Sequence, residues 1–305
     1  MKRITLFLAA LISLPAFAGK WDEMNYGPYL SASLEVPGAG IVNKGIAIRL
    51  DAGEGGVSKG SAFMLYDTDL MNCAAGWGGG FIDWRGIAFD GRHNAHASIT
   101  GTQSFANPVG PGWRSAKGKW ADDARVKGLD NKPYGPLPRA WAHYKGLYVN
   151  GNRVVLSFTV GSRGVFESPS LHGKNVFIRN LHIAPGQREI VMQVARGTVS
   201  AMHLAGSMDI VFVKAAKGTV IAATVVGGSG LWDLDDGANP RLRIPAANKV
   251  LKLQVLIWNG KHGEIGGFEK AVAAVKKAGD APNLLALTGG GPAKWKQTVE
   301  TSIQP

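Results

Sequence analysis

Cysteine is almost absent from this chain of 305 residues, and Cys73 is the only one. A single cysteine excludes an internal disulfide and any C-x-x-C metal or haem-attachment motif. Apolar runs are short, and none reaches the roughly 20 residues that a transmembrane helix needs. The G-x-y period of collagen is missing, as are the heptads of a coiled coil and the regular repeats of a solenoid or propeller. The sequence therefore predicts a domain that depends on its own core, with no transmembrane segment.

Acidic residues are also few. The chain has 22 Asp and Glu but 34 Lys and Arg, so its net charge is +12. The basic residues are scattered along the chain, which is typical of a solvated surface and also suits an acidic partner. Gly is abundant instead, with 42 residues, about twice its usual share. A chain with so many turn-forming residues favours β structure over a helical bundle.

The N-terminus has the three parts of a secretory signal peptide. Lys2 and Arg3 supply the positive start, residues 4–14 form the apolar core, and Ala16-Phe17-Ala18 fits the cleavage rule. We therefore expect residues 1–18 to be removed and the mature protein to be periplasmic or secreted. Export makes nucleic acid an unexpected partner.

Short alternating runs separated by Gly and Pro predict strands through most of the chain. The clearest runs are 44–50, 61–66, 146–149, 152–160, 189–194, 210–213, 219–226 and 250–258. Asn150-Gly151 between two apolar runs predicts a hairpin with a type I′ turn. Spacing near ten residues predicts an all-β fold, a jelly-roll-like β-sandwich over residues 19–287.

Two segments depart from this β pattern. Residues 265–278 carry Phe268, Val272 and Val275 at helical spacing before Gly279, which predicts one short C-terminal helix. Residues 91–140 lose the periodicity among many Gly, Pro and Trp residues, which predicts a long covering loop. The polar stretch 288–305 is predicted to be a tail or linker.

Long Trp- and Gly-rich stretches carry a family resemblance. They are WDEMNYGPYLSASL at 21–34, the segment 44–90 that begins KGIAIRLDAGEGG, PVGPGW at 108–113, and YGPLPRAWAHYKGLYVNGNRVVLSFTV at 134–160. The chain resembles an uncharacterised bacterial domain family, typically the N-terminal part of large secreted proteins with a quinoprotein-like β-propeller and a c-type cytochrome domain. The family has no established catalytic residues, so the resemblance assigns none to this chain. It does imply a propeller or cytochrome partner on another, nearby-encoded chain, and Trp295 in the tail is a candidate contact.

The region 76–144 is the richest in groups that could bind a ligand. Aromatic rings beside carboxylates and arginine are what a sugar site needs, because rings cover C–H faces and polar groups take hydroxyls. The candidate ligand-binding residues are Trp77, Trp84, Arg85 and Trp141, and the candidate catalytic residues are Asp83, Asp90, His96 and His143. The alternative is that these tryptophans only anchor a loop on the sheet.

Metal and cofactor signals are weak. His93-x-x-His96 lacks an identifiable third ligand, and the acidic run 232–237 lacks the EF-hand spacing for calcium. Neither a P-loop nor a G-x-S-x-G elbow is present. We therefore predict no metal and no cofactor.

Two functions remain open. The first is an extracytoplasmic, non-catalytic module that binds carbohydrate or docks a redox partner. The second is a polysaccharide-active enzyme, a lyase or hydrolase acting on acidic glycans, in which the basic charge would attract an anionic polymer.

Overall fold

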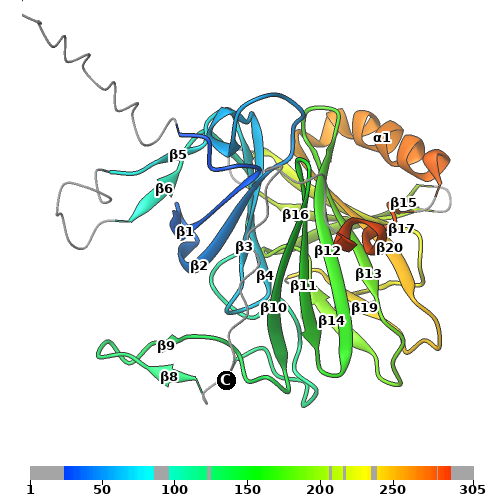
Figure 1. Ribbon diagram of the computed structural model, residues 1–305. Coiled ribbons are helices and arrows are strands. Elements are labelled where there is room, and N and C mark those ends of the chain that lie inside the picture. Colours follow the sequence, from blue (N-terminus) through cyan, green and yellow to red (C-terminus); the bar gives the residue numbers. More distant parts are fainter. Residues whose placement is uncertain are drawn as a thin grey trace, which may run out of the picture.

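The computed structural model describes residues 24–85, 96–121, 125–205, 208–215, 218–234, 239–279 and 281–289 (Figure 1). Several sequence predictions fall outside these ranges. They concern the signal peptide 1–18, Asp90, His93, the end of the acidic run 232–237, and Trp295.

Strands make up most of the fold, as the sequence predicts. They are β1 (Tyr29–Val36), β2 (Gly40–Arg49), β3 (Ala62–Asp67), β4 (Asn72–Gly78), β5 (Ile82–Asp83), β6 (Ala97–Ile99), β7 (Thr102–Ala106), β8 (Val126–Lys127), β9 (Pro133–Tyr134), β10 (Ala142–Asn150), β11 (Arg153–Val160), β12 (Arg163–His172), β13 (Val176–Ile183), β14 (Ile190–Gln193), β15 (Val199–Ala205), β16 (Met208–Lys214), β17 (Val220–Val226), β18 (Leu231–Asp233), β19 (Arg241–Ile244) and β20 (Leu251–Gly260). The helical elements are η2 (Val57–Lys59), η4 (His262–Glu264), α1 (Ile265–Ala278) and η5 (Leu284–Gly289).

One sheet curls into a half-barrel, with its strands in the order β5-β6-β1-β2-β3-β4-β7. A single segment joins its two sides, because β6 pairs with β1 while β7 pairs with β4. Gly101 lies at the bend with a φ of +75°, where a Cβ would contact the carbonyl oxygen of Gly78. Only glycine fits this bend without strain. A hydrophobic cluster that includes Phe63, Leu65 and Trp77 fills the enclosed space.

A second, larger sheet has the order β10-β11-β12-β13-β20-β17-β16-β15, and it packs against the half-barrel through one shared hydrophobic cluster. Strand β2 serves both cores, because Ile46 and Ile48 belong to the shared cluster and Ala47 to the half-barrel interior. Successive side chains on a strand point to opposite faces, so the alternation in the sequence divides them. The prediction of a mainly β fold is confirmed, and the jelly-roll connectivity stays a prediction.

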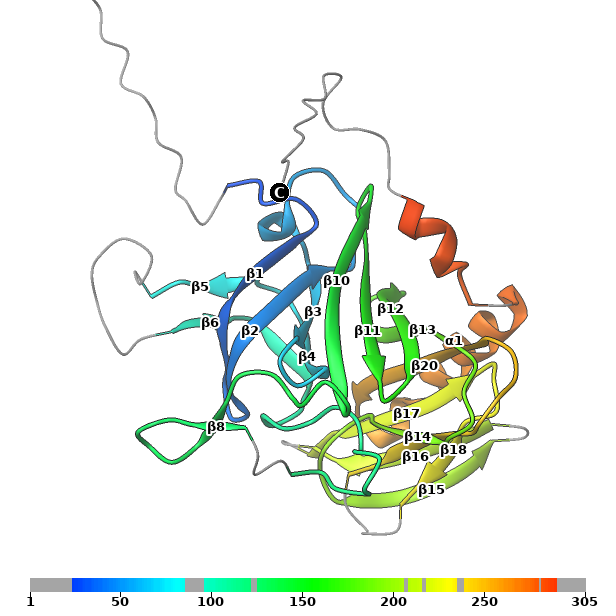
Figure 2. The same cartoon turned by 60° about the horizontal axis from the view of Figure 1, so that its bottom comes forward.

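The predicted helix is confirmed as α1, over the residues expected. Its apolar face packs on the second sheet, where the rings of Trp258 and Phe268 stack with centroids 5.9 Å apart. Figure 2 shows α1 on the side of this sheet away from the half-barrel. Within the described residues, no helix has the length and apolar character needed to cross a membrane.

Two local predictions need correction. The segment 91–140 is not a structureless loop, since its described part contains β6, β7, β8 and β9. Strands β6, β8 and β9 are only two or three residues long, too short for a period, and β7 has five residues but a single buried side chain, so it shows no alternation. The predicted hairpin of β10 and β11 exists, but Asn150 pairs with Arg153, so the loop is Gly151-Asn152 rather than Asn150-Gly151. Only Gly151 has a positive φ, which excludes the type I′ turn that the sequence predicts.

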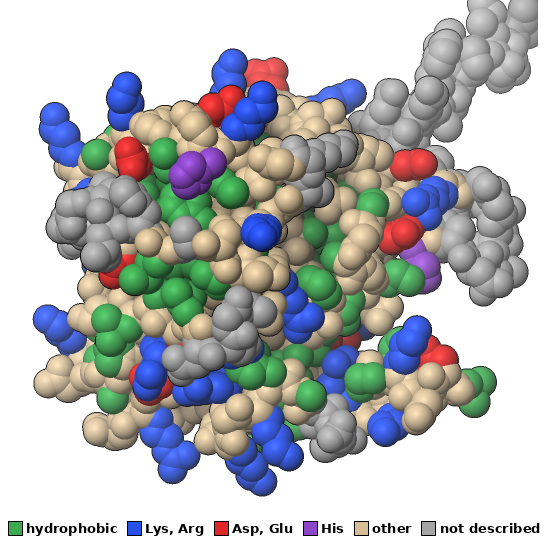
Figure 3. All heavy atoms as spheres, turned by 180° about the vertical axis from the view of Figure 1, so that it is seen from behind, with side chains coloured by type: hydrophobic (Ala, Val, Ile, Leu, Met, Phe, Trp, Pro, Cys, Tyr) green, Lys and Arg blue, Asp and Glu red, His purple; other side chains and the backbone are tan. Residues whose placement is uncertain are grey.

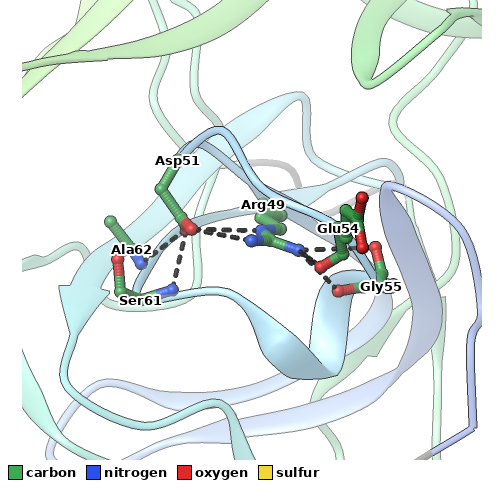
Figure 4. Close-up of polar contacts among 7 residues, drawn as sticks. Arg49, Asp51, Glu54, Gly55, Ser61 and Ala62 are labelled. Carbon is green, nitrogen blue, oxygen red and sulfur yellow. Dashed lines mark hydrogen bonds and ion pairs between the residues drawn. The ribbon is translucent and has the colours of Figure 1, made fainter.

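The Gly-rich stretch 51–56 has a structural role (Figure 4). It wraps around the Arg49 guanidinium, which donates to the carboxylate of Asp51 and to the carbonyl oxygens of Glu54, Gly55 and Gly56. Burial alone would raise the pKa of Asp51, but hydrogen bonds from Arg49 and from the N–H groups that follow at 61 and 62 outweigh it and lower the pKa. The loop thus satisfies an arginine of the chain itself, and no phosphate-binding role is needed to explain its glycines.

Asp67 ends β3 and is buried, which raises its pKa to about 6 although Oδ1 accepts the N–H groups of Asp69 and Leu70. The unfolded pKa is near 3.8, so the folded state binds more protons between these values. Stability therefore falls as pH rises from about 4 to 6 and then levels off.

We expect Asp67→Asn, which keeps an acceptor for both N–H groups, to stabilise the fold by about 2 kcal/mol at pH 7 and by little at pH 4. Urea unfolding at the two pH values measures this difference. A constant difference would contradict it.

Candidate functional site

A cavity of about 710 Å³ lies where four segments meet. We call it the Trp141 cavity. Its lining comes from the loop 114–118, from Ala140 and Trp141 before β10, from the β11–β12 turn 160–163, and from residues 188–191 at the start of β14. Its volume is in the range of about 300–1,000 Å³ that is usual for small-molecule sites.

Trp113 positions one wall of the cavity. It forms a bridge with Met192 of β14 and is fully buried, and its carbonyl oxygen accepts the Trp141 indole N–H at 2.8 Å. The next residue continues the pairing, because Arg114 N–H donates to the Val191 carbonyl at 2.9 Å. Buried indole groups of this kind hold one orientation, since their N–H must keep its acceptor. The cavity therefore has a preformed wall.

Residues 115–119 of the loop are also held by hydrogen bonds within the loop. Ser115 N–H donates to the Lys119 carbonyl, and Lys119 N–H donates back to Ser115 Oγ, both at 2.9 Å. Gly118 N–H donates to the Ser115 carbonyl, also at 2.9 Å. A compact turn thus borders the cavity, within the segment that the sequence marks as a covering loop.

An ion-pair network extends from two residues of the cavity wall, Arg114 and Glu189. The Glu189 carboxylate accepts hydrogen bonds from the guanidinium groups of Arg114, at 3.2 Å, and Arg243, at 3.1 Å. A second Arg114 nitrogen lies 3.9 Å from a carboxylate oxygen of Asp233. The side chains of Arg114 and Glu189 are about one-third exposed. Ion pairs this exposed contribute only about 0–1 kcal/mol, so the network positions side chains more than it stabilises the fold.

Arg163 is the most buried charge on the cavity wall, with 1% of its surface exposed. It donates to three backbone carbonyls, those of Ala184, Arg188 and Pro245. Burial lowers the pKa of this guanidinium. Its remaining nitrogen, Nη2, is buried and has no hydrogen-bond partner among the residues that the structure describes.

The predicted ligand-binding residues do not form one site. Trp141 lines the cavity, although only 8% of its surface is exposed. Trp77 is fully buried inside the half-barrel, with its N–H donating to the carbonyls of Gly80 and Phe81, so the prediction of an accessible platform ring is wrong for it. The ring packs in the half-barrel cluster beside Phe63, with their centroids 5.1 Å apart, and its N–H keeps acceptors there, which makes full burial tolerable.

Trp84 and Arg85 lie at β5, on the outer edge of the half-barrel (Figure 1). The Trp84 ring is 6.3 Å from the ring of Tyr26. Arg85 forms an ion pair with Glu35 at 2.5 Å, and its N–H donates to the Asp83 carboxylate at 2.9 Å. These three predicted residues thus share one edge, which is separate from the Trp141 cavity.

The predicted catalytic residues are distributed in the same way. Asp83 lies on β5, His96 immediately precedes β6, and His143 is on β10, opposite Thr159 of β11. Asp90 is outside the described residues. Asp83 and His143 lie on strands of different sheets, and the catalytic role of these residues stays a prediction. In the part of the chain that the structure covers, no three His, Cys, Asp or Glu side chains are placed to hold a metal ion.

Sequence reasoning missed Arg114, Arg163, Arg188 and Glu189. They come from three separate segments, with Arg188 and Glu189 adjacent in one of them, and none belongs to a motif with a known spacing. The available signals were weak: Trp113 next to Arg114, and an arginine directly after the Gly161-Ser162 turn.

Residues 64–167 match the family model of a domain of unknown function, DUF6797. This confirms the coarse form of the resemblance, an uncharacterised domain, and leaves its propeller and cytochrome context a prediction. The matched region supplies Arg114, Trp141 and Arg163 to the cavity, while Arg188 and Glu189 lie beyond it.

No curated protein matches the chain. Among solved structures, the crystal structure of heparinase III is similar over 70% of this chain, with 11% identity and a TM-score of 0.34. The chain spans 35% of that structure's length. At this distance the similarity carries no argument about activity.

Proposed function

We propose that the protein is an exported, non-catalytic carbohydrate-binding module and that the Trp141 cavity holds the ligand. The observation that carries the proposal is the cavity itself, about 710 Å³ with an indole and several guanidinium groups on its wall. Sugars bind where an apolar ring surface and fixed hydrogen-bond donors converge. Export rests on the sequence of residues 1–18, and N-terminal sequencing of the secreted protein, expected to begin at Gly19, tests it.

Trp141→Leu is expected to weaken glycan binding about ten-fold, because it removes the indole from the cavity wall while keeping an apolar side chain in the core. A glycan array at high protein concentration selects the ligand, and isothermal titration calorimetry then compares the variants. Thermal unfolding verifies that each variant is folded.

Trp84→Leu is the matched control, since Trp84 is the tryptophan of the other predicted surface, at β5. Binding should be unchanged in this variant. If Trp84→Leu lost binding and Trp141→Leu kept it, the ligand would belong to the β5 edge instead. If no glycan on the array bound, the proposal of a carbohydrate-binding module would be wrong.

The enzyme alternative is tested with the same ligands. Turnover of an acidic glycan, lost in His143→Ala with binding retained, would favour a lyase or hydrolase over a binding module. Unchanged turnover in single variants of Asp83, Asp90, His96 and His143 would remove these residues from consideration.

Docking of a redox partner rests on the family resemblance, and one surface suits it. The hairpin of β8 and β9 projects from the body (Figures 1 and 2) and exposes the side chains of Val126, Leu129 and Tyr134 beside Lys127 and Lys132. Exposed apolar groups with basic neighbours are typical of protein contacts. Pull-down of a propeller or cytochrome protein encoded nearby tests this candidate.

A further inference from the structure

The wall of the Trp141 cavity carries more positive than negative charge. Its charged residues are Arg114, Arg163, Arg188 and Glu189. Glu189 is the only carboxylate among them, and it is already engaged by Arg114 and by Arg243 outside the lining. The two remaining guanidinium groups, Arg163 and Arg188, therefore determine the charge that a ligand meets.

Arg163 is a buried cation without a counter-ion. Its hydrogen-bond acceptors are three neutral carbonyl oxygens, and the residues that the structure describes include no carboxylate paired with it. A buried charge normally has an ionic partner, because neutral groups only partly replace its hydration. The cost is visible in the lowered pKa of the guanidinium, for which burial is the cause. An anion in the adjacent cavity would supply the missing charge.

Arg188 provides the accessible part of the site. Its side chain is exposed, and its backbone carbonyl accepts the Nη1 hydrogen bond of Arg163, so the two residues are held together. Guanidinium groups bind carboxylates and sulfates well, because their N–H donors form a planar fork. On the one face of the molecule that Figure 3 draws, Lys and Arg side chains occur in several places.

We propose that the Trp141 cavity recognises the anionic group of an acidic sugar residue, a carboxylate or a sulfate ester, through Arg188 with the buried charge of Arg163 behind it. This inference rests on the proposed carbohydrate-binding function and adds its ligand class. A neutral glycan leaves the charge of Arg163 uncompensated, whereas an acidic one offsets it, and this difference sets the selectivity.

The experiment titrates the full mature chain with three oligosaccharides of equal length: an oligogalacturonate, a sulfated galacto-oligosaccharide and a neutral galacto-oligosaccharide. We expect at least one acidic ligand to bind ten-fold or more tightly than the neutral one. Comparison of the two acidic ligands identifies the group as carboxylate or sulfate. Added salt should weaken acidic binding more than neutral binding.

Arg188→Ala should weaken binding of the acidic ligand about ten-fold, more than it weakens binding of the neutral one, so that the ratio of the two affinities falls. Lys277→Ala on α1 is the control for the lost charge, since Lys277 is also exposed but lies on another element. Arg163→Met is the second variant, because it retains an apolar chain of similar length. Where it folds by circular dichroism, it should lose the acidic preference as well.

The outcomes separate the two proposals. Equal binding of acidic and neutral ligands would overturn the anionic class and leave the carbohydrate-binding function standing. Binding of none of the three ligands, together with a blank array, would overturn both. An acidic preference that survives Arg188→Ala and is lost in Lys277→Ala would move the anion site away from this cavity.

Discussion

Glu167→Gln is expected to lower the free energy of unfolding by about 3–5 kcal/mol, the largest effect of a single polar substitution in this protein. Glu167 on β12 binds Arg179 on β13 through both carboxylate oxygens, at 2.6 and 3.0 Å, and each side chain is 1% exposed. Burial alone would lower the pKa of Arg179, but the charge of Glu167 outweighs it and raises the pKa. The glutamine variant keeps the shape of the side chain and leaves the guanidinium buried without its counter-charge.

Urea unfolding at pH 7 measures this loss, and thermal unfolding should show a fall of about 10 °C for a domain of this size. The control replaces both partners, with Glu167→Leu and Arg179→Met together, which removes the pair without leaving a lone charge. Its loss should be clearly smaller than that of Glu167→Gln, because apolar pairs of similar volume often replace buried ion pairs at little cost. A loss below about 1 kcal/mol in the single variant would show that water or another group solvates Arg179.

Gly112→Ala is expected to destabilise the protein by about 3 kcal/mol and to weaken ligand binding at the same time. Gly112 lies against the β3–β4 turn, where a Cβ would meet the Met71 carbonyl oxygen and, at 2.7 Å, the Cα of Asn72. These are backbone atoms, so they cannot rotate away as a side chain would. The backbone at Gly112 would have to move to make room for the Cβ. This displacement would pass directly to Trp113 and Arg114, which follow in the chain and form one wall of the Trp141 cavity.

Gly110→Ala is the matched control, two residues earlier in the same stretch. There a Cβ would approach the Arg196 guanidinium at 2.8 Å, the end of a flexible side chain, so stability should change by less than about 1 kcal/mol. Denaturant unfolding and ligand titration of both variants measure the two effects together. If Gly112→Ala were as stable as Gly110→Ala, the contact with the β3–β4 turn would not position the cavity wall.

Local patterns in the sequence predicted local elements well. The alternation of 44–50 marks β2, and the three-and-four spacing of Phe268, Val272 and Val275 marks α1. In α1 the spacing arises because one face is buried against the second sheet and the other is exposed, whereas in β2 the alternation divides Ile46 and Ile48 from Ala47 between two cores. Strands of two or three residues, such as β6, β8 and β9, have no period, so the sequence of the region 91–140 predicts a loop where the structure has short strands.

The candidate site was only partly predictable, since residue type does not tell which surface is accessible. Trp77 and Trp141 are the same residue in the same Trp-rich region, yet Trp77 fills the half-barrel interior and Trp141 reaches a cavity. The difference lies in which face of a strand or turn each ring occupies after the sheets have packed. Trp84 belongs to the same Trp-rich region, yet it lies next to β5 at the edge of the half-barrel sheet.

The sequence by itself determined the mainly β class of the fold, the position of helix α1 and the hairpin of β10 and β11, because these depend on short-range periodicity and on glycine conformation. Only the tertiary structure decided that one bent segment, 97–106, joins both sides of the half-barrel. It also decided that Arg114, Arg163 and Arg188 line one cavity. Their proximity depends on long-range strand pairing and on burial, and these are properties of the whole packed chain rather than of any window of residues.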